Sequence, residues 1–155
     1  MQRRHSKAMA DQPAPSPARP IRAEVAGNRL ELIETGEERL RALIELVAGA
    51  RESLVVLMYM YNPDRTGEIV RDALVEAALR GVRVRLLIDG FGSAAPPSFF
   101  AALDESGGEY CVFNPTYGRR YLVRNHQKLI VADNRVAIIG GANIDDTYMT
   151  DSGAK

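Results

Sequence analysis

Two kinds of apolar pattern alternate along the first part of the chain. After Thr35 and again after Thr66, apolar residues recur at helical spacing, and Glu38 completes a capping box with Thr35. Residues 53–60 and 82–89 are instead apolar runs of strand length, which is typical of strands buried on both faces. The alternation predicts an α/β domain in which helices are layered on a β-sheet.

The later part of the chain carries a different pattern. After a third helix and a further strand, residues 114–125 are polar and predict a loop. Two strands, residues 126–132 and 135–139, then follow with only Asp133-Asn134 between them, a pair that favours a tight turn. This terminal hairpin makes the expected sheet mixed rather than wholly parallel.

The N-terminal segment has the composition of a tail. Its prolines remove backbone hydrogen-bond donors, and few apolar side chains are available for burial. We therefore predict a disordered, Pro-rich basic tail over residues 1–27 and a domain over residues 28–155, with ordered structure beginning near Asn28.

Composition constrains the cellular location of the protein more than its function. Lys and Arg together number 20, as do Asp and Glu, so the net charge points to neither a nucleic-acid nor a membrane partner. The sole cysteine, Cys111, excludes an internal disulfide and fits a reducing compartment. No apolar run is long enough to cross a bilayer. We expect a cytoplasmic chain whose membrane contact, if it has one, is peripheral and at the inner face of the cell membrane.

The candidate chemistry gathers at the terminal hairpin. Residues two apart on a strand project from the same face, so His126 and Lys128 would lie side by side. An imidazole and an ammonium are costly to bury without a partner, so the pair indicates a site that binds an anion. Asn143 follows two glycines after the second strand, and the hairpin would bring its amide, a donor to phosphate oxygens, back beside them.

At this spacing the residues resemble the signature of the phospholipase D superfamily, in which H-x-K, four residues, D and six residues precede G-G-x-N. The matching positions are His126, Lys128, Asp133, Gly140, Gly141 and Asn143. Residues 86–90 and 141–145 are most similar to the first half of a bacterial cardiolipin synthase. The resemblance implies a phospholipase D-like half domain, with a mixed β-sheet layered with helices.

The resemblance also implies a mechanism. His126 would attack phosphorus and form a covalent phosphohistidine, while Lys128 and Asn143 would bind the non-bridging oxygens of the substrate phosphate. Asp133 completes the catalytic motif. It lies an odd number of residues from His126, however, so we expect it to face away and to act structurally, by accepting hydrogen bonds from turn amides. One motif histidine and scattered carboxylates make no ligand cluster, so no metal or other cofactor is implied.

The chain carries one copy of a motif that the family uses twice, once for the nucleophile and once for a general acid. The other histidine, His5, lies in the tail without a matching Lys or Asp. Either the chain is truncated at its C-terminus and the second motif belongs to a missing half, or a homodimer mate supplies it, as in family nucleases. We favour truncation, and we expect the chain alone to have little activity.

Three functions therefore stay open. The first is phosphatidyl transfer or hydrolysis of the cardiolipin synthase type, with a glycerophospholipid as substrate. The second is a homodimeric single-motif endonuclease, the alternative under which nucleic acid is a partner. The third is a fragment that binds anionic phosphate groups without turnover.

Three neighbouring segments have alternative interpretations. Residues 90–95 loosely fit a dinucleotide fingerprint, but a loop that lines the pocket is favoured because they follow a late strand. Arg119, Arg120 and Arg124 form either a solvated basic loop or a site that captures phosphate groups. Residues 58–61 are expected to be strand end and core rather than the wall of a lipid cleft.

Overall fold

The computed structural model describes residues 21–114 and 123–151, which belong to two compact units divided after Ile33. In the smaller unit, β1 (Arg22–Val25) pairs antiparallel with β2 (Asn28–Glu31). Gly27 adopts a φ of 79°, which the tight turn between these strands requires. The expected start of ordered structure near Asn28 was therefore too late, because the hairpin needs the strand that begins at Arg22. Residues 1–20 of the predicted tail lie outside the described residues.

The larger unit is built on a five-stranded sheet with the order β5-β4-β3-β6-β7. Its strands are β3 (Ser53–Met58), β4 (Arg83–Asp89), β5 (Glu109–Phe113), β6 (Leu129–Ala132) and β7 (Val136–Ile139). Strand β4 is parallel to both β3 and β5, whereas β6 is antiparallel to both β3 and β7. The prediction of a mixed sheet in an α/β domain is confirmed.

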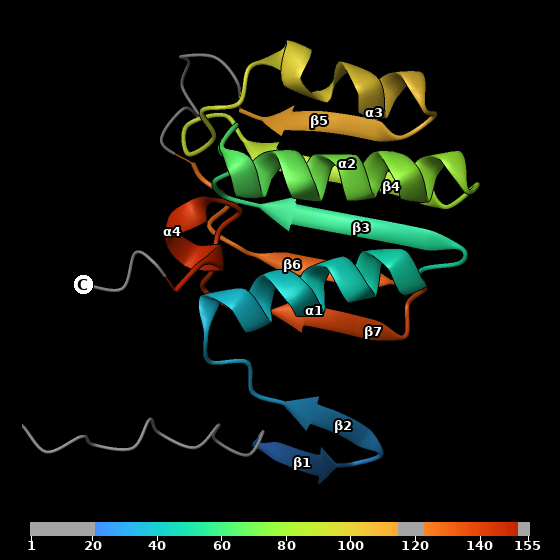
Figure 1. Ribbon diagram of the computed structural model, residues 1–155, viewed down its shortest axis with the longest axis vertical. Coiled ribbons are helices and arrows are strands. Elements are labelled where there is room, and N and C mark those ends of the chain that lie inside the picture. The colour runs from blue at the N-terminus through green and yellow to red at the C-terminus, as the bar shows by residue number, and fades with distance from the viewer. Residues whose placement is uncertain (1–20, 115–122, 152–155) are drawn as a thin grey trace, which may run out of the picture. The chain divides into compact units, whose positions relative to one another are not determined.

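Helices α1, α2 and α3 lie on one face of this sheet (Figure 1). The helical elements are α1 (Gly36–Gly49), α2 (Arg65–Leu79), the 3₁₀ turn η1 (Pro97–Phe100), α3 (Ala101–Glu105) and the short α4 (Asp146–Met149). The predicted capping box of Thr35 and Glu38 is present at α1, and Asp64 caps α2. Within the two described ranges, no helix is long and apolar enough to span a membrane.

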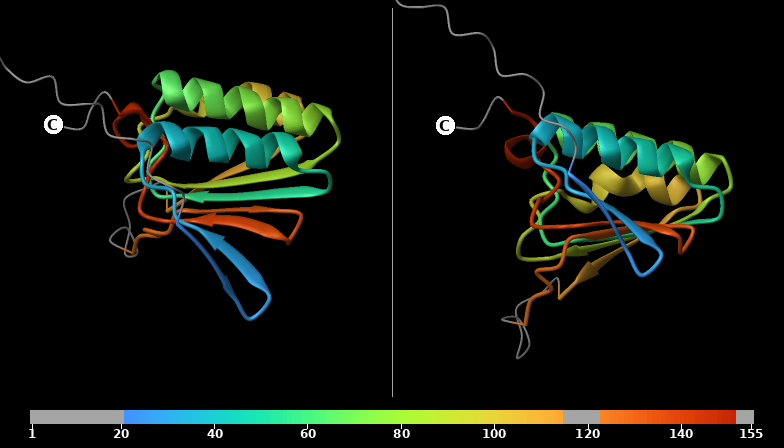
Figure 2. Two further views of the ribbon diagram at one scale, coloured as in Figure 1. Left: turned by 60° about the horizontal axis from the view of Figure 1, so that its bottom comes forward. Right: turned by 90° about the horizontal axis from the view of Figure 1, so that it is seen from below.

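The hydrophobic core lies between the helices and the sheet. Alternate side chains of β3, those of Leu54, Val56 and Met58, are buried. Val55, on the opposite face of β3, keeps 42% of its surface exposed. The expectation that residues 53–60 are buried on both faces was therefore wrong, because α1, α2 and α3 share one side of the sheet (Figure 2).

One end of the sheet gathers segments that are distant in sequence. We call it the carboxyl end, because β3, β4 and β5 finish there. Antiparallel β6 begins at this end, and β7 finishes there. The segment after β7 then pairs with the segment after β3, through a parallel bridge between Tyr61 and Ile144. The backbone amide of Asn62 donates to the carbonyl oxygen of Ile144 at 3.0 Å and extends this pairing.

Reciprocal capping holds α4 to α2. The carboxylate of Asp64 accepts hydrogen bonds from the backbone amides of Gly67 and Asp146, each at 2.9 Å. The carboxylate of Asp146 accepts one from the amide of Thr66, also at 2.9 Å. These bonds satisfy amides that a helix leaves without internal acceptors, and they fix the chain behind β7 to the first turn of α2.

Replacing Gly67 by alanine tests this packing. A Cβ at position 67 would lie 1.9 Å from the carbonyl oxygen of Asn62, so the first turn of α2 would have to shift. We expect Gly67→Ala to lower the free energy of unfolding by about 1–3 kcal/mol, measured by urea denaturation. Gly49→Ala, at the end of α1, is the matched control, because a Cβ there meets nothing within 4 Å. Equal unfolding midpoints for the two variants would contradict the close approach.

Candidate active site

His126 and Lys128 lie together where the chain enters β6. Lys128 Nζ is 3.1 Å from each ring nitrogen of His126 and donates a hydrogen bond to the His126 carbonyl oxygen at 2.8 Å. An ammonium can donate only to the ring nitrogen that carries a lone pair, which is also the atom that a nucleophile offers. The two side chains are therefore neighbours, as their spacing predicted, although the regular strand begins only at Leu129.

Lys128 is a buried cation without a carboxylate beside it. Its exposed fraction is 5%, and it takes part in no ion pair with the residues that the structure describes. Burial lowers the pKa of Lys128, because its charged form loses part of its hydration. A phosphate group at this position would supply the missing negative charge and would favour the ammonium form.

Tyr59, in the segment after β3, contacts both of these side chains. The centroids of the Tyr59 and His126 rings are 4.5 Å apart, and Lys128 Nζ lies 5.1 Å from the Tyr59 centroid, a cation–π distance. Sequence reasoning assigned residues 58–61 to strand end and core and missed Tyr59 as a wall of the site. The available signal was its position directly after a parallel strand, where functional loops gather in α/β sheets.

Asn143 reaches the carboxyl end from the segment after β7. It is 3% exposed, and its side-chain oxygen accepts a hydrogen bond from the backbone amide of Met60 at 3.3 Å. This bond orients the carboxamide and attaches it to the residue that follows Tyr59. The hairpin thus brings Asn143 to the end of the sheet that carries His126 and Lys128, and the closer approach of its amide to their side chains stays a prediction.

Asp133 lies at the other end of β6. Its carboxylate accepts hydrogen bonds from the backbone amides of Arg51, Glu52 and Ser53 at 2.9, 2.8 and 2.9 Å. The bond from Ser53, followed by the other two, lowers the pKa of Asp133, because these donors stabilise the carboxylate form. The structure therefore does not bring this motif residue together with His126. Its structural role is as expected, but the amides that it holds lie at the start of β3 rather than in its own turn.

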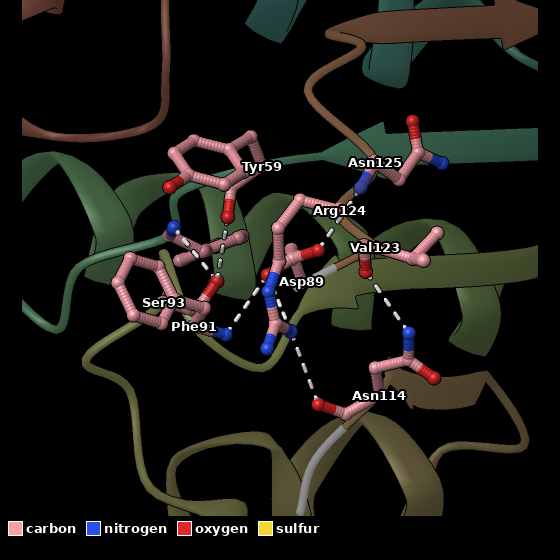
Figure 3. Close-up of polar contacts among 9 residues, drawn as sticks. Tyr59, Asp89, Phe91, Ser93, Asn114, Val123, Arg124 and Asn125 are labelled. Carbon is pink, nitrogen blue, oxygen red and sulfur yellow. Dashed lines mark hydrogen bonds and ion pairs between the residues drawn. The ribbon is translucent and has the colours of Figure 1, made fainter. Parts of the chain in front are cut away.

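A second polar cluster surrounds Asp89 at the end of β4 (Figure 3). The Asp89 carboxylate is 1% exposed and accepts hydrogen bonds from the backbone amides of Phe91 at 2.8 Å and Asn125 at 3.1 Å. It also forms an ion pair with Arg124, at 3.4 Å. The cluster therefore connects β4 to the residues directly before His126.

Arg124 is an internal residue of this cluster. Its side chain is 14% exposed, and it also donates to the carbonyl oxygen of Asn114 at 3.2 Å. The interpretation of a solvated basic loop is therefore wrong for Arg124, because its guanidinium pairs with a buried carboxylate. Arg119 and Arg120 lie outside the described residues.

The loop after β4 also supports Tyr59. Ser93 Oγ accepts a hydrogen bond from the Tyr61 amide at 3.2 Å and donates one to the Tyr59 carbonyl oxygen at 3.3 Å. A Cβ at Gly92 would lie 2.4 Å from that carbonyl oxygen and 3.0 Å from the Tyr59 ring, so only glycine allows this approach. Residues 90–95 thus pack against the wall of the site, in line with the favoured interpretation of a pocket-lining loop.

The remaining candidates for a site carry less chemistry. In residues 21–114 and 123–151, no three His, Cys, Asp or Glu side chains are grouped as metal ligands. A surface hollow on the β1–β2 hairpin is lined by Arg22, Ala23, Glu24, Arg29 and Glu31. Its charged side chains form exposed ion pairs with one another, and it contains no motif residue. We therefore place the candidate active site at the carboxyl end of the sheet.

Comparisons with known proteins identify the family of the chain. The family model described as "Cardiolipin synthase, PLD-like domain" matches residues 43–152. The major cardiolipin synthase ClsA of Bacillus subtilis is 35% identical over 127 residues, which cover 79% of this chain and 26% of that protein. Cardiolipin synthase B of Salmonella typhimurium is 32% identical over 133 residues, which cover 82% of this chain and 32% of that protein. The chain thus spans no more than a third of the length of these relatives.

Two solved structures have a similar fold. NucT from Helicobacter pylori has a TM-score of 0.59 at 21% identity, covering 75% of this chain and 73% of that chain. Nuc from Salmonella typhimurium, a phospholipase D family member, has a TM-score of 0.54 at 25% identity, covering 72% and 68%. The fold and the motif define a domain of the phospholipase D superfamily. Within it, the chain belongs to the family of cardiolipin synthase PLD-like domains.

We expect Asp133→Asn to weaken folding and to leave phosphate binding unchanged. The carboxylate accepts through both oxygens, and an amide retains only one acceptor, so the variant should unfold at a lower urea concentration at neutral pH. Because folding lowers the pKa of Asp133, its contribution is present above the ordinary carboxyl pKa and is lost as the pH falls through the lowered value. The difference from wild type should therefore narrow towards acidic pH.

Urea denaturation across this pH range, together with titration of inorganic phosphate at neutral pH, measures both effects. A folded Asp133→Asn variant that no longer binds phosphate would show that the carboxylate acts on the site after all.

Proposed function

We propose that this chain supplies the nucleophile half of a phospholipase D-type phosphodiesterase or phosphatidyltransferase of the cardiolipin synthase kind. The observation that carries the proposal is the contact between Lys128 and His126, at 3.1 Å, in a member of this family. A buried ammonium beside an imidazole, with no carboxylate to neutralise it among the described residues, suits a site that receives a phosphodiester.

The proposed reaction has two displacements at phosphorus. In the first, a ring nitrogen of His126 attacks the phosphorus of a glycerophospholipid, an N–P bond forms and the P–O bond to the leaving alcohol breaks. A general acid gives the leaving oxygen its proton. In the second, the hydroxyl group of another lipid, or water, attacks the phosphohistidine and loses its proton to the same group, and His126 leaves.

Lys128 and Asn143 would stabilise the charge that gathers on the non-bridging oxygens. Lys128 offers an ammonium that is already largely shielded from water. Asn143 offers amide hydrogens, because Met60 engages its side-chain oxygen. Donors that are fixed before the reaction lower the barrier, because they need no reorganisation as the charge develops.

The general acid has to come from a second motif. The described residues include one histidine, His126, so an imidazole that protonates the leaving group must be supplied from elsewhere. We propose that the rest of a longer protein supplies it, because the chain spans 26% and 32% of the two relatives compared. A second copy of this chain is the other source.

A lipid substrate would bring the site to a membrane surface. Phe91 and Val123, which are 58% and 57% exposed, belong to the two segments that meet at Asp89. Exposed apolar side chains beside a site suit contact with lipid more than contact with a nucleic-acid backbone. They support peripheral contact with a membrane surface.

The alternative is a homodimeric endonuclease that applies the same chemistry to nucleic acid. Its support is the likeness of fold to Nuc, the phospholipase D family member with a TM-score of 0.54. A third function, binding of phosphate groups without turnover, would need only the donors of Lys128 and Asn143. Parallel assays on phosphatidylglycerol and plasmid DNA, both with EDTA, separate the first two functions, and the mass in solution reports a dimer.

The covalent step can be tested without the second motif. Bis(p-nitrophenyl) phosphate has a leaving group that departs without a proton, so no general acid is needed. We expect the chain to release nitrophenolate in a stoichiometric burst. The peptide that contains His126 should gain the mass of a nitrophenyl phosphoryl group, detected by mass spectrometry after alkaline quenching.

Three variants control this experiment. His126→Gln should abolish both the burst and the mass gain, and Lys128→Met should slow the burst by about 10²-fold. His5→Gln should change neither, since His5 lies outside the motif. A modified residue other than His126 would refute the mechanism, and phosphate binding without a burst would favour the binding-only function.

A further inference from the structure

The segment that leads into His126 has no regular secondary structure, yet it is fixed on both sides (Figure 3). The backbone amide of Asn125 donates to Asp89 Oδ2 at 3.1 Å, and the side-chain amide of Asn114 donates to the carbonyl oxygen of Val123 at 2.9 Å. Asp89 therefore holds a backbone atom of the residue directly before the proposed nucleophile.

Arg124 extends this attachment across two strands. Its Nη1 lies 3.4 Å from Asp89 Oδ1 and donates to the carbonyl oxygen of Asn114 at 3.2 Å. The guanidinium lies 5.2 Å from the centroid of the Phe91 ring, at a cation–π distance. One planar cation thus joins the end of β4 to the residue after β5, a geometry that suits arginine better than lysine.

Asp89 also supports Tyr59, the side chain that packs against His126. Its carboxylate accepts from the Phe91 amide at 2.8 Å, and its carbonyl oxygen accepts from the Ser93 amide at 3.1 Å. Ser93 in turn donates to the carbonyl oxygen of Tyr59 at 3.3 Å. The loop that Asp89 organises therefore supports the ring that contacts His126.

We propose that Asp89 is a positioning residue, which sets the place of the His126 imidazole between Tyr59 and Lys128. Among the described residues, its side-chain contacts do not include the imidazole, and it acts through its ion pair with Arg124, its hydrogen bond from the Asn125 amide and the loop after β4. The inference deepens the proposed function and rests on it, because the position of His126 matters to the reaction only if His126 attacks phosphorus. A displacement of about 1 Å in a group that reacts with the substrate can slow the reaction by about 10²-fold.

Asp89→Asn tests the inference with little change in side-chain volume. The Phe91 amide bonds Oδ1 of Asp89 and the Asn125 amide bonds Oδ2, so in asparagine an NH₂ group replaces one of these two acceptors and faces a donor. The readout is the ring proton signals of His126, which the ring current of Tyr59 shifts because the two centroids are 4.5 Å apart. The chain has two histidines, so a His5→Gln background leaves one imidazole to observe.

In folded Asp89→Asn, we expect the His126 signals to move towards those of an unstacked imidazole and the nitrophenolate burst to slow by about 10²-fold. Arg124→Lys, which keeps the charge but lacks the planar fork, should change both readouts in the same direction and to a smaller extent. Urea denaturation of each variant shows that the protein measured is folded.

The chain offers matched controls. Asp133→Asn makes the same substitution in a carboxylate that also holds backbone amides, but at the other end of β6. Arg85→Lys alters an arginine that pairs with Glu109 at 3.1 Å on the surface. Both controls should keep the wild-type His126 signals and the wild-type burst, even where they lose stability.

Each outcome decides between explanations. Unchanged His126 signals in folded Asp89→Asn would rule out the positioning role, and so would displaced signals with an unchanged burst. If Asp89→Asn does not fold, the same two readouts on Arg124→Lys decide the question. If the wild-type chain shows no burst, the covalent mechanism fails, while the His126 signals still report whether Asp89 positions the ring.

Discussion

The antiparallel course of β6 beside β3 is the constraint on which the site depends. The register pairs Leu57 with Leu129 and Leu54 with Ala132, so the start of β6 lies beside the end of β3. The residues just before Leu129 therefore meet the residues just after Met58, and His126 and Lys128 come against Tyr59. The same register sends Asp133, which follows Ala132, to the amides at the start of β3. One strand thus divides the motif between the two ends of the sheet. Had β6 run parallel to β3, the imidazole would lie at the end away from Asp89.

Carboxylates at the ends of the sheet are engaged by backbone amides, and this shapes the electrostatics of the site. The residues that accept such hydrogen bonds include Asp64, Asp89, Asp133, Asp145 and Asp146. Each bond fixes a loop or a helix end, and none of these five carboxylates forms an ion pair with Lys128. Equal numbers of acidic and basic residues in the whole chain are therefore compatible with a local cation that no carboxylate of the described residues neutralises. A carboxylate paired with Lys128 would compete with an arriving phosphate. No such carboxylate occurs among the described ion pairs. Lys128 is therefore better suited to binding an anion than to stabilising the fold through an ion pair.

The parts of the structure that could be predicted are those encoded by local periodicity. His126 and Lys128 precede β6 and Asp133 follows it, so their separation depends on one strand alone and could be predicted from the sequence. Tyr59 and Asp89 were missed because their roles depend on which strands are neighbours, and strand order is set by packing over the whole sheet. The amides held by Asp133 lie about 80 residues earlier in the chain, beyond any local pattern. The exposure of the sheet face that carries Val55 was missed for a related reason. An apolar run indicates burial but does not say which side of the strand the helices cover.

The geometry around His126 bears on why the family uses its motif twice. The ring that attacks phosphorus must offer a lone pair, and the ring that protonates the leaving oxygen must offer a proton, within the same displacement. An ammonium donates and cannot accept, and Lys128 Nζ lies 3.1 Å from both ring nitrogens of His126, so it can donate to whichever of them carries a lone pair. A phosphate oxygen that takes the hydrogen bond of Lys128 would release this lone pair at the moment when phosphorus is within reach. The contact with Lys128 supports the proposal that His126 makes the attack and that a second motif supplies the proton of the leaving oxygen.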